Sequence, residues 1–359
     1  MNPLREKIAG LIRASGPMSV SDFMSLSLFD PQHGYYTTRQ PFGAAGDFIT
    51  APEISQMFGE LVGVWAASVW RDLGETRGGI LAEIGPGRGT LMKDMLRTVP
   101  KLIPGFLAEN SVHMIEASPR LTSVQQKTLG DAASDMRWHG AFSELPDGPL
   151  LIVGNELFDA IPVRQYIRTA QGWRERCIGL DEAEELQFVA GPGTIDPTLL
   201  PAGSLQAPEG AIFEAAPARA ALMQQIAERI AIQGGAALFF DYGHLESGLG
   251  DTLQAVMNHR HDDPLANPGR ADLTTHVDFA ALADVVRAAG LIPHLTTQGE
   301  FLLGLGLLER AGSLGANASA QEREKLSAAV ERLAGPNEMG NLFKVLAFSS
   351  SSRVPAPFQ

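Results

Sequence analysis

Cysteine is nearly absent from this sequence, since Cys177 is the only one among 359 residues. A single cysteine excludes an intramolecular disulfide and a cysteine-rich metal site, and it fits a reducing compartment. The eight histidines lack the HExxH spacing of a common zinc site. We therefore expect a functional site without a metal.

Long apolar runs and excess positive charge are absent as well. No segment approaches the roughly 20 apolar residues of a membrane-spanning helix, and residues 1–7 lack the apolar core of a secretory signal. The 28 basic residues are outnumbered by 41 acidic ones, which gives a net charge of −13. Such a charge disfavours nucleic-acid binding and suits a basic partner. We expect a soluble, cytoplasmic protein without a membrane span, and the sequence does not indicate its oligomeric state.

From residue 80 onward the sequence contains a regular alternation of strand and helix patterns. Strands that alternate with helices indicate a parallel sheet covered on both faces. A last strand over 342–348 is predicted as an antiparallel edge strand. The expected fold class is therefore α/β, with a seven-stranded, mostly parallel, Rossmann-like sheet. Its other strands are predicted over 80–84, 113–116, 136–139, 150–153, 236–240 and 292–297.

Three other regions suggest how the chain is divided. We predict an N-terminal helical and loop extension with a glycine-rich lid over 1–78, followed by the sheet domain over 79–350. Two insertions, 155–210 with hairpin-like runs and 242–276 rich in turns, interrupt the alternation. Both follow the carboxyl ends of strands, where an open parallel sheet holds its ligand. Both are therefore predicted to contribute to substrate binding.

A glycine-rich turn between a strand and a helix marks the candidate cofactor site at residues 81–90. Glycine at positions 85, 87 and 89 leaves room for a ligand at the end of the strand and permits positive φ (Gly85, Gly87 and Gly89). The helix that follows offers free N–H groups to a carboxylate or a phosphate. We consider a dinucleotide, S-adenosylmethionine, or a purely structural turn.

The spacing and the neighbouring carboxylates favour S-adenosylmethionine. The glycines follow GxGxG and not the GxGxxG of a dinucleotide site. Glu83, just before the first glycine, suits the ammonium or, through water, the sulfonium of S-adenosylmethionine, and it would repel a pyrophosphate. Glu116 ends the next strand and can accept both ribose hydroxyls of either cofactor. The sequence therefore predicts a methyltransferase with the usual class I sheet.

Several blocks extend this interpretation over nearly the entire chain. They are DPQHGYY at 30–36, GDFITAPEIS at 46–55, FGE at 58–60, the glycine motif at 83–90, GNELFDAIP at 154–162, DYG at 241–243, DLTTHVDF at 272–279 and GNLFKV at 340–345. On these blocks the sequence resembles the MidA-like family of class I methyltransferases, which includes a mitochondrial assembly factor of respiratory complex I. The resemblance implies protein-arginine methylation that yields symmetric dimethylarginine, with a peripheral-arm subunit of complex I as the target in mitochondrial members. A homologous subunit, or another protein, would be the partner here.

Two carboxylates after strand 150–153 are the candidate catalytic groups. Arginine is a poor nucleophile because its guanidinium is delocalised and stays protonated, so a carboxylate must orient it. Glu156 and Asp159 are proposed for this role, with Asn155 binding cofactor or substrate through its amide. The alternatives are a solvated loop carboxylate for Glu156 and a turn cap for Asp159. Better-known arginine methyltransferases carry two glutamates far apart on one hairpin, so the arginine assignment depends on the resemblance.

The N-terminal glycine loop has two interpretations. Asp47, Thr50 and Glu53 either form a lid over the cofactor, with Thr50 in contact with it, or serve as turn and helix caps. Two other functions stay open beside protein-arginine methylation. One is a methyltransferase for a small molecule, and the other is an assembly chaperone with little turnover. The intact motif at 83–89 and Glu116 argue against a dead cofactor site.

Overall fold

The computed structural model describes residues 2–38 and 49–358. The chain forms two compact units, each assembled from three separate stretches. Unit 1 comprises Met1–Phe48, Phe158–Ala221 and Glu246–Val277. Unit 2 comprises Ile49–Leu157, Leu222–Leu245 and Asp278–Gln359. The chain therefore passes between the two units repeatedly.

These boundaries differ from the predicted ones for a physical reason. We predict an extension over 1–78, but the residues from Ile49 onward group with unit 2. Helix α5 (Gln56–Asp72) carries Phe58, Trp65 and Trp70, all buried in the core of that unit. Unit 1 instead joins the N-terminal segment to most of both predicted insertions.

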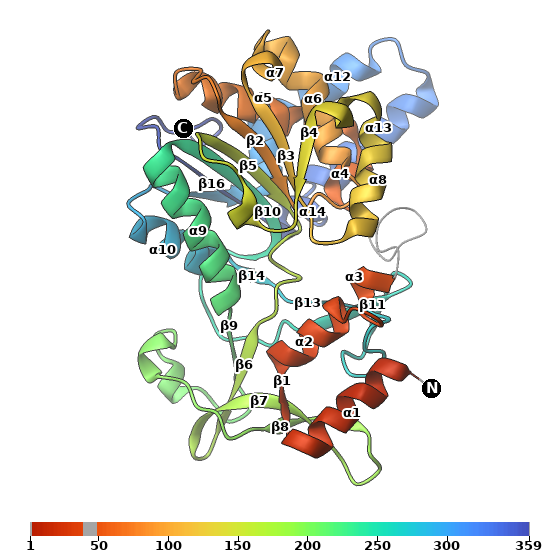
Figure 1. The fold of residues 1–359 in the computed structure, drawn as a ribbon, viewed down its shortest axis with the longest axis vertical. Helices are drawn as coiled ribbons and strands as arrows, with labels where there is room; N and C mark the ends of the chain where they lie inside the picture. The colour runs from red at the N-terminus through yellow and green to blue at the C-terminus, as the bar shows by residue number, and fades with distance from the viewer. Residues whose placement is uncertain (1, 39–48, 359) are drawn as a thin grey trace. The chain divides into compact units, whose positions relative to one another are not determined.

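The sheet of unit 2 runs in the order β15-β16-β10-β5-β2-β3-β4. Strands β10, β5, β2, β3 and β4 are parallel, and β16 is antiparallel to both of its neighbours. Helices α9 and α10 lie on one face, and α6 and α8 on the other (Figure 1). The predicted mostly parallel α/β sheet is confirmed. These strands are β2 (Ile80–Ile84), β3 (Ser111–Ile115), β4 (Met136–His139), β5 (Leu150–Asn155), β10 (Gly235–His244), β15 (His294–Thr297) and β16 (Phe343–Ser349), and the short strand β14 (Val277–Asp278) also pairs with β10.

The prediction of an edge position for the last strand is wrong. Strand β15 pairs with β16 on the side away from β10, so β16 lies inside the sheet. Every residue of β16 except Lys344 is buried, and buried backbone groups require hydrogen bonds on both sides. The shorter, half-buried β15 takes the edge.

Several helices of unit 2 begin where the sequence supplies a capping side chain. Helical periodicity extends over residues 52–73 in the sequence, but the helix divides at Ser55, whose hydroxyl accepts the Met57 N–H. Ser319 and Glu322 form a capping box that starts α13. The helices are α4 (Ala51–Ile54), α5, α6 (Thr90–Leu102), α7 (Phe106–Glu109), α8 (Pro119–Leu129), α10 (Phe279–Ala288), α11 (Gln298–Gly304), α12 (Leu307–Gly315), α13 (Ala320–Ala334) and α14 (Met339–Leu342), and α9 (Pro217–Gln233) begins in unit 1.

Unit 1 is built on an antiparallel sheet of order β1-β7-β6-β9, with β8 on β7. The predicted hairpin is confirmed as β6 and β7, closed at Thr169 and Gly172. A second small sheet has the order β12-β11-β13. The helices and strands of unit 1 are α1 (Pro3–Ser15), α2 (Val20–Phe29), α3 (Tyr35–Thr38), β1 (Met18–Ser19), β6 (Arg164–Thr169), β7 (Gly172–Leu180), β8 (Leu186–Ala190), β9 (Ile212–Ala215), β11 (Gln254–Met257), β12 (Arg260–Asp262) and β13 (Asp272–Thr274).

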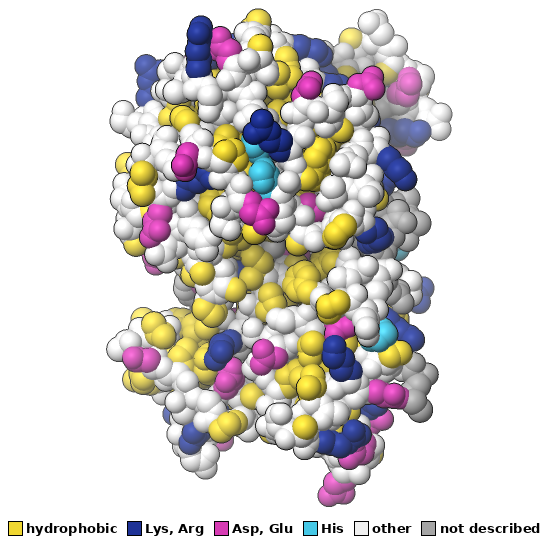
Figure 2. All heavy atoms as spheres, viewed as in Figure 1, with side chains coloured by type: hydrophobic (Ala, Val, Ile, Leu, Met, Phe, Trp, Pro, Cys, Tyr) yellow, Lys and Arg dark blue, Asp and Glu magenta, His cyan; other side chains and the backbone are white. Residues whose placement is uncertain are grey.

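Acidic and basic side chains are interspersed over the face drawn in Figure 2, without one large basic area. This distribution agrees with the excess of acidic residues in the sequence. None of the helices among residues 2–38 and 49–358 is long and apolar enough to cross a membrane.

Candidate cofactor and acceptor site

The glycine turn after β2 depends on a backbone conformation that favours glycine. Gly85, Gly87 and Gly89 have φ of 66°, 51° and 83°, in the left-handed region that other residues rarely adopt. The Gly89 N–H donates to the Pro86 carbonyl at 2.7 Å and closes the turn. Gly89 also precedes α6 as its N-cap and offers no side-chain cap. The backbone therefore requires glycine here, whether or not a ligand is bound.

Glu83 lies beneath this turn and bonds to the helix that follows it. Its carboxylate accepts the Met92 N–H at 3.1 Å and so satisfies one free donor at the start of α6. Burial raises the pKa of Glu83 to about 8; the Met92 N–H opposes this rise, and Glu116 adds to it. A nearby cation would favour the charged carboxylate. Glu83 therefore caps the helix, and its predicted contact with a cofactor ammonium stays a prediction.

Glu116 is held in place at the carboxyl end of β3 by two donors. One carboxylate oxygen accepts the Ser118 N–H at 2.8 Å, and the other accepts Gln125 Nε2 at 3.0 Å. Burial raises the pKa of Glu116, while these two hydrogen bonds oppose that rise. Because the side chain is fixed before a ligand arrives, the geometry suits a carboxylate that receives ribose hydroxyls.

Gln125 is a site residue that sequence reasoning missed. The side chain is fully buried in α8, and its amide nitrogen donates both to Glu116 and to the Gly87 carbonyl at 3.0 Å. Its amide oxygen accepts Trp138 Nε1 at 2.9 Å. Gln125 thus links the ribose-side carboxylate to the glycine turn. A glutamine within a predicted helix gives no sequence signal for such a role.

Asn155 and Glu156 follow one another at the carboxyl end of β5. The Asn155 amide nitrogen donates to Glu156 Oε1 at 2.9 Å, and the Glu156 N–H donates to the Phe240 carbonyl at 2.9 Å. Glu156 has φ of 53°, a conformation that costs a non-glycine residue about 1–3 kcal/mol and often marks a functional position. The carboxylate is therefore oriented by its neighbour on a constrained backbone.

Asn155 also leaves one buried acceptor without a partner. Its amide oxygen is inaccessible to solvent and has no hydrogen bond among the described residues. Buried polar atoms are normally hydrogen-bonded, because an unpaired one costs about 1–3 kcal/mol. A donor from a ligand at this edge of the sheet would satisfy it. This atom, the glycine turn and Glu116 together fit S-adenosylmethionine.

Thr50 caps α4 through its backbone only. Its carbonyl accepts the Glu53 and Ile54 N–H groups at 2.9 and 3.2 Å, and its side chain makes no cap hydrogen bond. The Glu53 carboxylate instead bonds to Arg88 Nη1 at 3.2 Å and to the Thr90 hydroxyl. Glu53 therefore fastens α4 to the glycine turn. Asp47 and most of the predicted lid lie outside the described residues.

The two candidate catalytic carboxylates belong to different units. Glu156 lies in unit 2 with all of the predicted cofactor residues, whereas Asp159 lies in unit 1. Asp159 Oδ1 accepts the Ala160 N–H at 2.8 Å. Its carbonyl accepts the Thr275 N–H at 3.2 Å. The catalytic role of Asp159 and the alternative of a turn cap both stay predictions.

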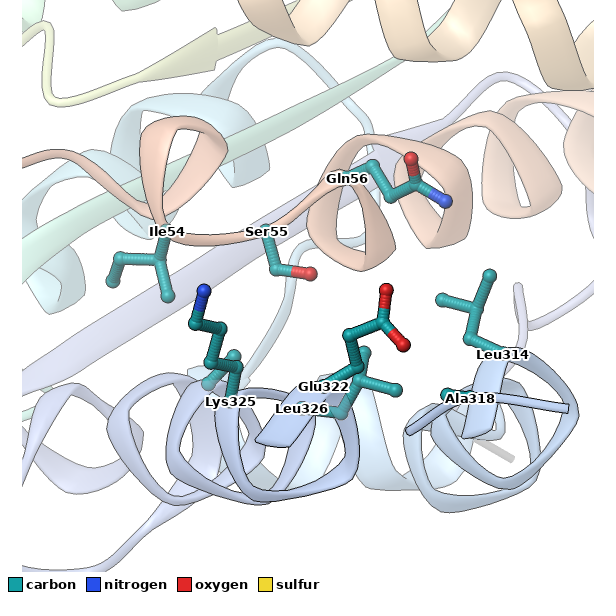
Figure 3. A pocket seen from close by; sticks show the side chains of 9 residues that line it. Ile54, Ser55, Gln56, Leu314, Ala318, Glu322, Lys325 and Leu326 are labelled. Atoms are coloured by element: carbon teal, nitrogen blue, oxygen red, sulfur yellow. The ribbon is translucent and has the colours of Figure 1, made fainter. Parts of the chain in front are cut away.

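A separate groove of about 340 Å³ lies between the start of α5 and helices α12 and α13. Figure 3 shows Glu322 and Lys325 rising from α13 toward the junction of α4 and α5. None of the predicted site residues lines this groove, so it is not the predicted cofactor site. Within residues 2–38 and 49–358, no cluster of His, Cys, Asp or Glu is placed to hold a metal.

Comparison with known proteins identifies the family that this chain resembles along most of its length. The model of a family described as S-adenosyl-L-methionine-dependent methyltransferases matches residues 61–297. The protein named "Protein arginine methyltransferase NDUFAF7, mitochondrial" is 35% identical in Danio rerio, over 97% of this chain and 87% of the relative. The human protein of that name is 33% identical, over 99% of this chain and 85% of its own.

A solved structure agrees along nearly the whole chain. It is a methyltransferase-like protein from Burkholderia thailandensis, crystallised with S-adenosyl-homocysteine. The two chains are 29% identical, the TM-score is 0.86, and the match covers 98% of this chain and 93% of the other. Another structure from Burkholderia thailandensis, with the same 29% identity, has a TM-score of 0.85 over 98% of this chain and 93% of the other.

The predicted cytoplasmic location is contradicted by these names. The relatives from Danio rerio and from human are both named as mitochondrial proteins. The prediction relied on one cysteine and on the lack of a secretory signal. A single cysteine fits any reducing compartment and does not distinguish one from another.

Proposed function

Because this chain belongs to the family of S-adenosyl-L-methionine-dependent methyltransferases, we propose that it methylates arginine side chains of a protein. Family membership confirms the predicted enzyme class and cofactor. The choice of arginine rests on one observation: relatives that are 33–35% identical over nearly all of this chain are named protein arginine methyltransferases. The geometry at Asn155 and Glu156 agrees with that choice.

The residues described above would hold the cofactor at the carboxyl edge of the sheet. When bound, S-adenosyl-L-methionine supplies a methyl group that is activated by a positively charged sulfur. The three glycines of the turn 85–89 give the ligand backbone without a side chain at those positions. Glu116 would accept the ribose hydroxyls, and the unpaired oxygen of Asn155 would accept a ligand N–H or O–H.

Glu156 is the carboxylate proposed to act on arginine. A guanidinium is planar and matches a carboxylate through two parallel hydrogen bonds. Asn155 fixes one carboxylate oxygen at 2.9 Å, so Glu156 could hold charge on one guanidinium nitrogen while the other accepted the methyl group. The methyl carbon–sulfur bond of the donor would break in the same step, with S-adenosyl-homocysteine as the leaving group. The proton lost on methylation would pass to a carboxylate directly or through water. Asp159 is retained as the second proposed catalytic residue.

The proposed substrate is a subunit of the peripheral arm of respiratory complex I, with symmetric dimethylarginine as the product. This proposal rests on the motif blocks at 154–162 and 272–279 that resemble the MidA-like family. The excess of 41 acidic over 28 basic residues suits a basic peptide.

Radiolabelled methyl transfer tests the proposal. Extracts of cells that lack this protein are incubated with the purified chain and labelled S-adenosylmethionine, and the protein and small-molecule fractions are counted separately. Label on one protein, followed by detection of symmetric dimethylarginine by mass spectrometry, is the expected result. Label only in the small-molecule fraction would favour a small-molecule substrate and contradict the arginine proposal.

A further inference from the structure

Arg219 is a buried arginine that ties together two of the motif blocks named above. It lies in the first turn of α9 and is 2% exposed. Its Nε donates to the Ile161 carbonyl at 3.2 Å, and its Nη1 donates to the His276 carbonyl at 2.7 Å. Its Nη2 donates to the Asp159 carbonyl at 3.2 Å and also contacts the Thr275 hydroxyl. All of these groups belong to unit 1.

We call this arrangement the Arg219 anchor, and it consists of Arg219, residues 159–161 and residues 275–276. The two segments also contact each other directly, because the Thr275 N–H donates to the Asp159 carbonyl at 3.2 Å. Each segment belongs to a block that carries the family resemblance, 154–162 or 272–279. The anchor therefore joins stretches that lie more than 110 residues apart in the sequence.

The anchor also lies next to three places where the chain passes between the units. The chain enters unit 1 at Phe158, leaves it after Ala221 and leaves it again after Val277. Arg219 and the two segments it binds are each within a few residues of one of these places. Glu156 and Leu157 are the last residues of unit 2 before the chain enters unit 1 at Phe158.

Only a guanidinium suits this set of acceptors. It presents five N–H donors in a rigid plane, so it can serve several carbonyls from different directions at once. A lysine has three donors on a single atom and cannot reach the same groups together. Removing the guanidinium would take a donor from the Ile161 and His276 carbonyls, and it would leave the Thr275 N–H to Asp159 carbonyl bond as the remaining described link between the two segments.

We propose that Arg219 is a positioning residue for methyl transfer. It fixes the backbone of 159–161, which begins three residues after Glu156, against 275–276, so that the chain that follows Glu156 keeps one conformation. This inference rests on the proposed function, in which Glu156 and Asp159 act on the methyl acceptor. The cofactor contacts at the glycine turn and at Glu116 involve no residue of the anchor. Loss of the anchor should therefore affect transfer far more than cofactor binding.

The test compares Arg219→Gln and Arg219→Lys with Arg229→Gln. Arg229 is a matched control, since it lies on the same helix and also donates to backbone carbonyls, those of Leu145 and Pro146. For Arg219→Gln we expect hydrogen exchange at 158–162 and 272–277 to become roughly 10-fold faster. We expect kcat to fall by about 10-fold or more, with the Kd for S-adenosyl-homocysteine changed less than about twofold.

Arg219→Lys should recover part of kcat and part of the exchange protection. Arg229→Gln should leave kcat unchanged, and it should also leave hydrogen exchange at 158–162 and 272–277 unchanged. Unchanged exchange in Arg219→Gln would overturn the anchor itself. A loss of cofactor affinity parallel to the loss of kcat would overturn its positioning role. An absence of protein-arginine methylation by the wild type would contradict the proposed function. The anchor would still be tested, because the hydrogen-exchange measurement needs no substrate.

Discussion

The cofactor edge of unit 2 and the polar network of unit 1 are held together in different ways. At the cofactor edge, Glu83 accepts the N–H of a residue nine positions later in the sequence, and Glu116 accepts the N–H of a residue two positions later. In unit 1, Arg219 bonds to carbonyls 60 and 57 positions away. Short-range contacts form wherever the local sequence is present, whereas long-range contacts require the finished fold. The glycine turn with Glu83 and Glu116 is therefore a local motif, whereas the Arg219 network is a product of tertiary structure.

The largest effect should come from breaking the local motif. In Gly85→Val, a side chain would have to adopt a φ of 66°, and its Cβ would lie 3.0 Å from Leu157 Cδ1. We expect binding of S-adenosyl-homocysteine to weaken by about 100-fold or more, since the branched side chain fills the turn that receives the ligand. Calorimetric titration measures this loss.

The control for Gly85→Val is Gly105→Val. Gly105 has a φ of 89° and open space around its Cβ position, so this variant carries the backbone strain without touching the cofactor edge. It should melt at a lower temperature and still bind the ligand. Normal binding by Gly85→Val would show that the turn does not receive the cofactor.

The next largest loss of activity is expected at Glu156, which lies in unit 2 two residues before the chain enters unit 1. Glu156→Gln removes the charge that would orient a guanidinium, a charge-assisted hydrogen bond worth about 1.5–3 kcal/mol. We expect methyl transfer to fall roughly 10- to 150-fold, with cofactor affinity nearly unchanged. Single-turnover transfer of a labelled methyl group gives the rate.

Glu75→Gln is the matched control for that experiment. Glu75 is another glutamate at positive φ, 52°, and it lies on the surface in an ion pair with Arg71 at 3.9 Å. Its replacement should leave the transfer rate unaffected. Wild-type turnover by Glu156→Gln would pass the carboxylate role to Asp159.

The smallest expected effect is a change in the pH dependence of stability, and it tests Glu83 in the local motif. The pKa of Glu83 is about 8 in the folded protein, against an ordinary value of 4.5. Between these values the folded state holds a proton that the unfolded state has lost, so the contribution of Glu83 to stability is fully present below about pH 4.5 and is lost as the pH rises toward 8. Glu83→Gln has no such proton to lose.

Thermal melting without cofactor tests this sign. From about pH 5 to pH 8, the melting temperature of the wild type should fall relative to that of Glu83→Gln, by roughly 5 °C. Saturating S-adenosylmethionine should reduce the difference if its ammonium contacts Glu83. Parallel melting profiles for the two proteins would mean that the carboxyl group is not buried as described.

Much of the sheet is readable from sequence because its strands are short apolar runs. Residues 80–84 and 136–139 are strands with the predicted bounds, and a glycine directly follows each of them. The position of the last strand is not readable, because the same apolar pattern serves an interior strand and an edge strand. Only its pairing with β15 distinguishes the two.

The candidate site divides in the same way. The sequence by itself determined the glycine turn, because GxGxG reflects a backbone that requires positive φ at all three glycines. The tertiary structure alone decided the roles of Gln125, Glu53 and Arg219. Their side chains are ordinary helix residues in the sequence, and they gain partners 35 or more positions away only when distant segments meet. Local backbone geometry is encoded in the residue types at each position, whereas the partner of a buried polar group is fixed by the fold.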